Sequence, residues 1–344
     1  MATVDITNNA IVNVPSNSPN DKTNDIRTVI HSVRDAGGGT IIFPSGVYHV
    51  TGNIFDGTEV SGNNKSNITI QGEGPGGTII RLHSSTPGTT PIILKTVGNT
   101  SQAAYFTMRD ITLDGNNVSG GALWFRFEKT SFVRLERMSI INTLSGVIYG
   151  RQWWDSVIHD VHFENVGTSS NVAAVLLDND ASPPTQFASS NNLKFEVCRW
   201  IDCGSMAVKM REFARMIYFT GCYFQGKETS GYSNIHIEPT TSSYACYLIS
   251  FNGCRFIEGG LHHIYAKWTH GVLVTGCGFE GKLGASNNAG YAIELDNTSN
   301  SVITGNNFAT GANPTPVTNG LGPYHTTGTT TGNVVKANVG LADI

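Results

Sequence analysis

The chain has 344 residues, of which 39 are Gly, and 14% are charged, with a formal net charge of −4. The sequence contains neither a basic stripe nor a run of 18 apolar residues, which excludes nucleic acid as a partner and a helical membrane span. So little charge among so much Gly, Asn, Ser and Thr favours many short strands and turns over helices.

Residues 1–20 form a polar N-terminal arm without the basic and apolar regions of a secretion signal. A capping helix and a first strand are expected within residues 21–50. The segment NDIRTVIHSVRDA (24–36) places its apolar residues at helical spacing, and Gly37 is a typical helix stop. The segment GGGTIIFPSGVYHV (37–50) is then predicted to form a strand.

The stretch TGCYFQG (220–226) recurs as NGCRFIEG (252–259) and TGCGFEG (275–281), with the cysteines 32 and then 23 residues apart. A constant core with variable spacing indicates stacked structural units joined by loops of different length. The cysteine position aligns along the chain as Ile111, Met138, Val161, Cys198, Cys222, Cys254, Cys277, Asn306 and Asn338. Two residues later the aligned positions include six aromatic residues: Phe163, Trp200, Phe224, Phe256, Phe279 and Phe308.

This alignment predicts a parallel β-solenoid, because a short strand of period two precedes each motif and parallel coils stack about 4.8 Å apart. Like residues would form interior ladders, with aromatic rings in register and the amides of Asn306 and Asn338 bonded along the stack. Four of the six cysteines fall in one ladder, where an inter-coil disulfide or a metal site is conceivable. The favoured interpretation is a free cysteine that fills a tight inward corner.

The order NDKTNDIRTVIHSVRDAGGGTIIFPSGVYHV (20–50) resembles the N-terminal cap of the pectate-lyase-superfamily β-helix proteins. That cap has a Gly-Asp-Gly-x-Thr-x-Asp segment, an amphipathic helix and a Gly-Gly-Gly-Thr-x-x-Phe-Pro-x-Gly-x-Tyr strand; here SPNDKTND stands where the family commonly has two glycines around the Asp. The resemblance implies an all-β, single-domain right-handed parallel β-helix with a short N-terminal capping helix. Its coils would occupy residues 51–344. A second strand recurs in each unit to about residue 310, and the C-terminal segment ends in one more coil-like strand.

The same resemblance implies a polysaccharide as the partner. The superfamily includes polysaccharide lyases, glycoside hydrolases of the polygalacturonase and rhamnogalacturonase kind, epimerases and phage tailspike depolymerases. The sequence has neither the Asn-Thr-Asp and Asp-Asp pair of polygalacturonases nor the Arg-x-Pro-x-x-Arg of pectate lyases, so no catalytic residue is transferred. Analogy with tailspikes implies a homotrimer, located in a virion tail or outside the cell.

The second strands direct a set of charged and aromatic side chains outward. Stacked coil by coil, the expected pairs are Trp124/Arg126, Tyr149/Arg151, Asp178/Asp180, Lys209/Arg211, His236/Glu238, Tyr265/Lys267 and Glu294/Asp296. In a chain with only 14% charged residues, this one face gathers a large part of the ionisable side chains, which indicates a polar groove. A ladder of inter-coil ion pairs explains the pattern equally well, since acids and bases alternate, and would contribute only about 0–1 kcal/mol per exposed pair.

Endo-acting hydrolysis of an acidic or mixed glycan is the leading hypothesis, with Asp178, Asp180 and Glu238 as the catalytic carboxylates. The first two would lie roughly 6.5–7 Å apart on one strand, and Asp180 and Glu238 roughly 9–10 Å apart across two coils. Lys209 and Arg211 would hold an anionic sugar. Hydrolysis of this kind needs no cofactor.

Two alternatives stay open. A secreted polysaccharide lyase would draw its base and its carboxylate clamp from Lys209, Arg211, His236, Tyr265 and Lys267, with Ca²⁺ held by Asp178 and Asp180. A non-catalytic glycan-binding or structural solenoid would use the charged face only as an ion-pair ladder. His236-x-Glu238 has the spacing of a metal motif, but the charged face already explains both side chains. LHHIYAKWTH (261–270) has three His, but no carboxylate or cysteine within ligand spacing supports a zinc site.

The stretch RQWWDS (151–156) supplies two adjacent indoles that must point to opposite faces of a strand. One of Trp153 and Trp154 is therefore expected in the core and the other at the surface. The exposed indole could stack on a sugar ring while Arg151 binds a carboxylate. Packing of both rings under a loop is the alternative.

Overall fold

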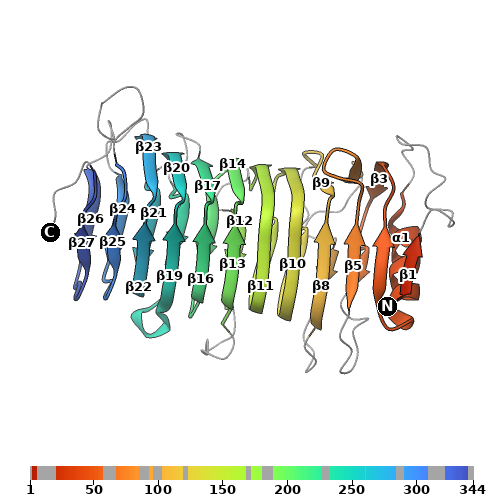
Figure 1. The fold of residues 1–344 in the computed structure, drawn as a ribbon, viewed down its shortest axis with the longest axis horizontal. Helices are drawn as coiled ribbons and strands as arrows, with labels where there is room; N and C mark the ends of the chain where they lie inside the picture. Colours follow the sequence, from red (N-terminus) through yellow and green to blue (C-terminus); the bar gives the residue numbers. More distant parts are fainter. Residues whose placement is uncertain are drawn as a thin grey trace.

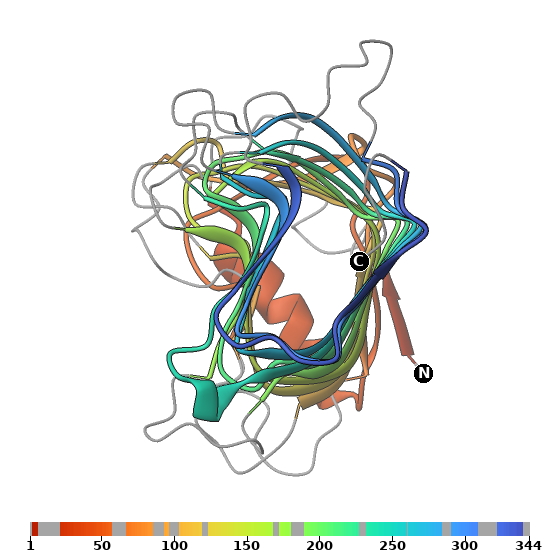
Figure 2. The ribbon, with the colours of Figure 1, turned by 90° about the vertical axis from the view of Figure 1, so that its left-hand side faces the viewer.

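Successive stretches of the chain lie on one another in parallel, like the turns of a wide coil (Figures 1 and 2). The computed structural model describes residues 2–5, 21–56, 67–84, 93–95, 103–118, 123–167, 172–179, 189–226, 232–259, 261–283, 290–308 and 322–339. Its strands pair in parallel with the preceding and following coil, and the predicted right-handed parallel β-helix is confirmed.

Each coil contributes strands to three sheets. The front sheet of Figure 1 contains β1(Ala2–Asp5), β2(Gly39–Ile42), β5(Ile68–Gln71), β8(Ala103–Arg109), β13(Asn191–Glu196), β16(Arg215–Thr220), β19(Cys246–Asn252), β22(Thr269–Thr275), β25(Val302–Thr304) and β27(Val334–Lys336). The upper sheet contains β3(Gly46–Val50), β6(Thr78–Leu82), β9(Thr112–Asp114), β14(Arg199–Cys203), β17(Tyr223–Gly226), β20(Arg255–Gly259) and β23(Gly278–Leu283). The rear sheet contains β4(Phe55–Asp56), β7(Ile93–Lys95), β12(Ala173–Leu177), β15(Met206–Met210), β18(Ile235–Ile237), β21(Ile264–Lys267), β24(Tyr291–Asp296) and β26(Gly322–Thr327). Two long strands, β10(Phe125–Thr143) and β11(Ile148–Val166), bend through all three sheets, and a 3₁₀ turn, η4(Ser242–Tyr244), precedes β19.

The predicted capping helix is confirmed as α1(Thr23–Asp35), which lies across the N-terminal end of the coil (Figure 2). Its buried face comprises Ile26, Val29, Ile30 and Val33. The Asp21 carboxylate accepts the backbone N–H of Thr23 at 2.9 Å, which satisfies a donor at the start of the helix. The helix thus covers core that the first coil would otherwise expose.

The predicted aromatic ladder fills the core beside the upper sheet. From Phe163 to Phe308 each ring stacks on the next, with centroid separations of 5.0, 4.6, 4.8, 4.9 and 4.8 Å. These separations match the spacing of parallel strands, so the backbone register itself sets the stacking distance. A second ladder, Phe195, Phe219 and Phe251, runs parallel to it with separations of 4.9 Å.

The six cysteines are free and buried, as the packing interpretation predicts. In the ladder, the Sγ of Cys222 donates to Phe195 O at 3.3 Å and that of Cys254 to Phe219 O at 3.4 Å. Burial raises the pKa of the Cys222 thiol, which favours its protonated state. The cysteines are therefore small core residues with a weak backbone hydrogen bond.

The glycine of the repeated Thr/Asn-Gly-Cys motif marks a corner between the front and upper sheets. Gly221, Gly253 and Gly276 have φ values of 61°, 61° and 62°, and Gly305, which precedes Asn306 at the same corner, has 67°. This left-handed conformation carries little cost for Gly. Val197 occupies the same corner one coil earlier, at φ 56°. The path of the coil therefore requires a positive φ at this corner whichever residue stands there, and Gly adopts it at the least cost.

The predicted Asn ladder continues the cysteine ladder toward the C-terminus. The Asn306 side chain accepts the backbone N–H of Cys277 at 2.8 Å and donates to Val274 O at 2.9 Å. It also donates to the Asn338 side-chain oxygen at 3.0 Å. One buried amide therefore connects three coils.

We predict that Asn306→Ala lowers the free energy of unfolding by about 2–4 kcal/mol, because it leaves buried backbone groups unpaired. Asn306→Cys should cost less, since Cys277 at the equivalent position in the preceding coil accepts the Cys254 N–H through its sulfur at 3.4 Å. Guanidinium unfolding of both variants measures the difference. Equal losses would contradict a role for the ladder bonds.

Candidate functional site

The outward side chains of the rear sheet form two rows along the axis of the coil. The first row is Arg126, Tyr149, Leu176, Lys209, His236, Tyr265, Glu294 and His325. The second row is Glu128, Arg151, Asp178, Arg211, Glu238, Lys267, Asp296 and Thr327. The predicted inward residues of β15, β18, β21 and β24 are buried.

The predicted stacking of Asp178 and Asp180 is wrong by two residues. Leu176 pairs with Lys209, and Asp178 lies beside Arg211. A slip of two residues leaves every side chain on its own face, so alternation alone cannot detect it. Asp180 lies outside the described residues.

The indoles also differ from the expected surface. Trp124, predicted to face outward, is fully buried, and its Nε1 donates to Thr143 Oγ1 at 2.9 Å. Trp153 is buried against Phe127, with ring centroids 4.7 Å apart, so this ring is not accessible to a sugar. Trp154 is half-buried and begins the front-sheet pairing with β13, so the expected split between core and surface is confirmed, but away from the two rows.

Ion pairs join neighbouring coils along the second row, as the ladder interpretation expects, and one pair crosses from the first row to the second. Arg126 donates to Glu128 at 2.7 Å, and Arg211 contacts Asp178 at 3.2 Å. Lys267 contacts the carboxylate of Glu238 at 3.8 Å. Its ammonium also lies 3.7 Å from Asp296 in the next coil. These contacts order the face, and the more exposed one, between Lys267 and Glu238, contributes little to stability.

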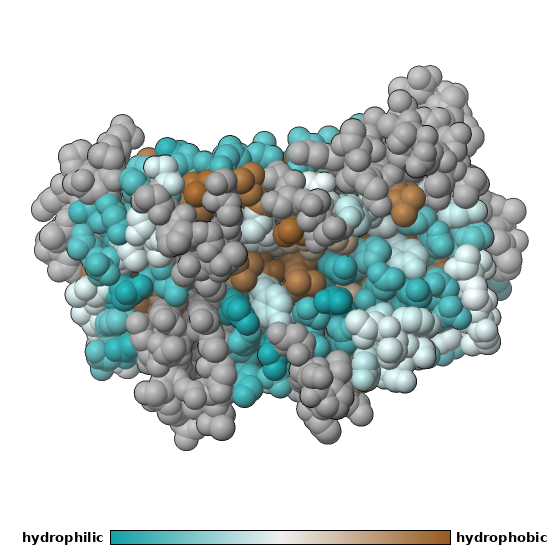
Figure 3. All heavy atoms as spheres, turned by 180° about the vertical axis from the view of Figure 1, so that it is seen from behind, coloured by the Kyte–Doolittle hydropathy of each residue, from teal (hydrophilic) through white to brown (hydrophobic). Residues whose placement is uncertain are grey.

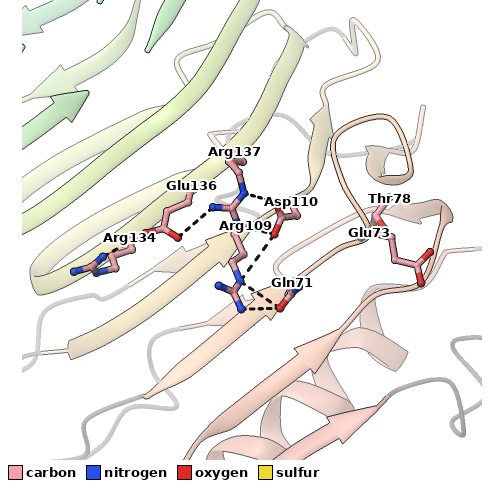
Figure 4. Close-up of polar contacts among 8 residues, drawn as sticks. All are labelled: Gln71, Glu73, Thr78, Arg109, Asp110, Arg134, Glu136 and Arg137. Carbon is pink, nitrogen blue, oxygen red and sulfur yellow. Dashed lines mark hydrogen bonds and ion pairs between the residues drawn. The ribbon is translucent and has the colours of Figure 1, made fainter. Parts of the chain in front are cut away.

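The front sheet carries a comparable network, which Figure 4 shows. Arg137 forms two bonds to Asp110, at 2.7 and 2.9 Å, and Arg109 donates to Gln71 at 2.8 Å. Arg134 contacts Glu136 at 3.4 Å. These bonds mainly join neighbouring coils, so this cluster serves the stacking of the coil.

A buried carboxyl pair lies at the end of β15, where Glu212 approaches Asp178. Glu212 is 4% exposed and Asp178 is 8% exposed. Burial and the hydrogen bond to Asp178 raise the pKa of Glu212, while the backbone N–H of Thr240 donates to it at 3.1 Å. Sequence reasoning missed Glu212, although a carboxylate at an inward position of the alternation was the available signal.

We predict that Glu212→Gln raises the free energy of unfolding at pH 8 by on the order of 1 kcal/mol, and has little effect at pH 4. The pKa of Glu212 is raised in the folded state, so its contribution to stability is complete below the unfolded pKa and is lost as the pH rises through the folded pKa. Chemical denaturation at both pH values measures this. Glu164→Gln, at a side chain that is 52% exposed, is the control and should show no such change.

A second pair of carboxyl groups, Glu294 and Asp296, lies on one face of β24. The two side chains are each 17% exposed, and Lys267 contacts Asp296. Burial raises the pKa of Glu294, and the negative charge of Asp296 adds to this effect while His325 opposes it. Two adjacent carboxyl groups thus lie in opposite electrostatic environments.

The aromatic neighbours of this pair hold it in place. The backbone N–H of Tyr291 donates to Nδ1 of His262 at 3.0 Å, and Nε2 of the same ring lies 3.3 Å from the Glu294 carboxylate. Burial lowers the pKa of His262 to about 4, so the ring is neutral at pH 7. Burial raises the pKa of Tyr265, and the nearby carboxylates, Asp296 first, raise it further, so its hydroxyl stays protonated and bonds Asp296.

His236 and Glu238 form the adjoining part of the site. Nε2 of His236 lies 2.9 Å from Glu238, and the imidazole stacks on Tyr265 with centroids 5.0 Å apart. Burial lowers the pKa of His236. Burial also acts to raise the pKa of Glu238, but the hydrogen bond from His236 and the charge of Lys267 give a net lowering.

A groove of about 280 Å³ lies nearer the N-terminus on the same face. It is lined by Leu123, Gly146, Ile148, Tyr149, Val172, Ala173, Leu176, Lys209 and Arg211. Figure 3 shows an apolar area at the centre of this face, bordered by hydrophilic residues. The two parts of the site are thus an apolar, basic groove and a cluster rich in carboxylates.

No group of three or more His, Cys, Asp or Glu side chains is placed to hold a metal ion within the described ranges. In the same part of the chain, no helix has the length and apolar character needed to cross a membrane.

The whole coil resembles solved β-helix structures. ORF18 of Geobacillus virus E2 superposes with a TM-score of 0.73 at 20% identity, over 98% of this chain and 62% of that one. The mannuronan C-5 epimerase AlgE6 A-module of Azotobacter vinelandii gives a TM-score of 0.57 at 16% identity, covering 98% and 96%. The chain has their parallel β-helix fold. The tailspike protein of E. coli bacteriophage HK620, in complex with a hexasaccharide, gives a TM-score of 0.58 at 14% identity, covering 98% and 65%.

Curated relatives match a shorter stretch, and no protein-family model matches the chain. Mannuronan C5-epimerase AlgE3 of A. vinelandii is 37% identical over 100 residues, which are 28% of this chain and 5% of that protein. Alginate lyase 7 of the same organism is 35% identical over 98 residues, 28% of this chain and 11% of that protein. The match therefore spans about a tenth or less of each relative.

Proposed function

We propose that this β-helix protein acts on a polysaccharide and cleaves it within the chain by hydrolysis on the rear sheet. The observation that carries the proposal is the pair Glu294 and Asp296, in which one carboxyl group has a raised pKa and its neighbour is paired with Lys267. Such opposite environments assign a general acid and a general base.

In this scheme protonated Glu294 gives its proton to the glycosidic oxygen as the bond to the anomeric carbon breaks. Asp296 takes a proton from the water that attacks the same carbon. Two outward residues, two positions apart on one strand, lie roughly 6.5–7 Å apart. This separation leaves room for the water and corresponds to inversion of the anomeric centre.

The sequence-predicted carboxylates suit these roles less well. Asp178 is nearly buried and paired with Arg211, so it has little access to a glycan. The lowered pKa of Glu238 disfavours it as an acid, although it could orient His236. We propose supporting roles for Tyr265 and Lys267, which hold Asp296.

A polysaccharide lyase is the second candidate, favoured by the similarity to alginate lyase 7 and by the neutral His236 imidazole as a base. The raised pKa of Tyr265 argues against its phenol as that base. Ca²⁺ belongs to this second candidate alone. By analogy with tailspikes, we also propose a virion tail or extracellular location and a homotrimer.

We predict that Glu294→Gln and Asp296→Asn each lower kcat by about 10²–10⁴-fold, the usual contribution of one acid or base. Reducing ends and the ultraviolet absorbance of unsaturated uronates are followed together on a panel of bacterial and plant polysaccharides. Reducing ends without absorbance support hydrolysis, and rising absorbance would instead establish the lyase. Glu280→Gln, on the upper sheet and paired with Arg255 at 2.8 Å, is the matched control.

The pH dependence provides an independent check. The acid must be protonated, so activity should fall as the pH rises above the raised pKa of Glu294, and it should also fall at low pH, where the base no longer accepts a proton. A bell-shaped profile of kcat/KM is the expected result. An activity that rises steadily to pH 9 would contradict a carboxylic acid as proton donor.

A further inference from the structure

Lys209 differs from three other cations of the two rows. Arg126, Arg211 and Lys267 each contact a carboxylate. Among the described residues, no carboxylate lies within ion-pair distance of Lys209. Its neighbours in the first row are Leu176 and the neutral His236, so its charge is not compensated within the row.

The groove that Lys209 lines also has an excess of positive charge. Its described lining contains Lys209 and Arg211 as charged residues and no carboxylate. Arg211 contacts Asp178 at 3.2 Å, whereas Lys209 forms no ion pair with a described residue, although its charge helps to lower the pKa of Glu238. The remaining lining is largely apolar, from residues such as Val172 and Leu176.

A ligand for this groove needs an apolar side of modest size and one negative charge. A hexuronate unit of a glycan has both, because its ring C–H groups form an apolar face and its carboxylate carries the charge. A neutral hexose would leave the ammonium without a partner. Charge complementarity therefore selects an acidic sugar.

We infer that the groove is a specificity subsite for one hexuronate unit, whose carboxylate pairs with Nζ of Lys209 while its ring lies on Leu176 and Val172. This inference rests on the proposed function, because the unit belongs to the glycan that Glu294 and Asp296 cleave. Lys209, His236, Tyr265 and Glu294 are consecutive in the first row. Three coils therefore separate the subsite from the acid, roughly 14 Å along the axis.

This separation has a consequence for the substrate. A glycan would run along the coil and reach both regions at once, so cleavage would fall at a fixed distance from a bound uronate. Oligosaccharides too short to span the two regions would lose the binding free energy of the remote contact, and kcat/KM would fall with it.

Calorimetric titration in the Glu294→Gln background measures binding without cleavage. The probes are oligomers of mannuronate, guluronate, galacturonate and glucuronate, and the same oligomers after reduction of their carboxyl groups. We expect at least one oligouronate to bind, Lys209→Met to weaken it tenfold or more, and Lys209→Arg to restore most of the affinity. Lys194→Met, on the front sheet and exposed, is the control and should change nothing.

Three results would overturn the subsite: equal affinity for an acidic oligomer and its reduced form, unchanged affinity in Lys209→Met, or no binding of any oligouronate. The catalytic proposal is tested separately by turnover of the Glu294→Gln variant. If that variant still cleaves while Lys209→Met loses binding, the carboxylate assignment fails and the subsite stands. Thermal unfolding of each variant confirms that the fold is intact.

Discussion

The parallel register of the coils is the constraint on which the rest of this structure depends. Each strand pairs with the equivalent strand of the next coil, so equivalent residues lie directly above one another. Inside, this favours residues that stack on their own kind, such as the aromatic ladder and the buried cysteines. The Asn306 amide adds hydrogen bonds between coils that apolar side chains cannot form.

The same constraint has the opposite consequence on the outer surface. Like charges stacked at this spacing repel one another, so the second row of the rear sheet alternates acid and base from Glu128 to Asp296. An outer face built in this way is largely self-neutralising. The places where the pairing is incomplete are therefore the places where ligand chemistry is available, and Lys209 and Glu294 are two of them.

Local environment then distinguishes carboxyl groups that are chemically identical. Glu212 and Glu294 both have a raised pKa through burial next to another acid, but the Glu212 side chain is nearly inaccessible. Glu238 lies close by on the same face, and its contacts with His236 and Lys267 lower its pKa. Accessibility and neighbouring charge together favour Glu294 as a proton donor.

Periodicity in the sequence determined the fold, the cap on residues 24–36 and the inward ladders, because alternation and like-on-like stacking are local properties of the chain. It also located the charged face. The tertiary structure alone decided the inter-coil register of Asp178, the burial of Trp153 and the contact of Glu212 with Asp178. These depend on where each loop returns the chain, and a shift by two residues preserves the alternation while it changes every neighbour.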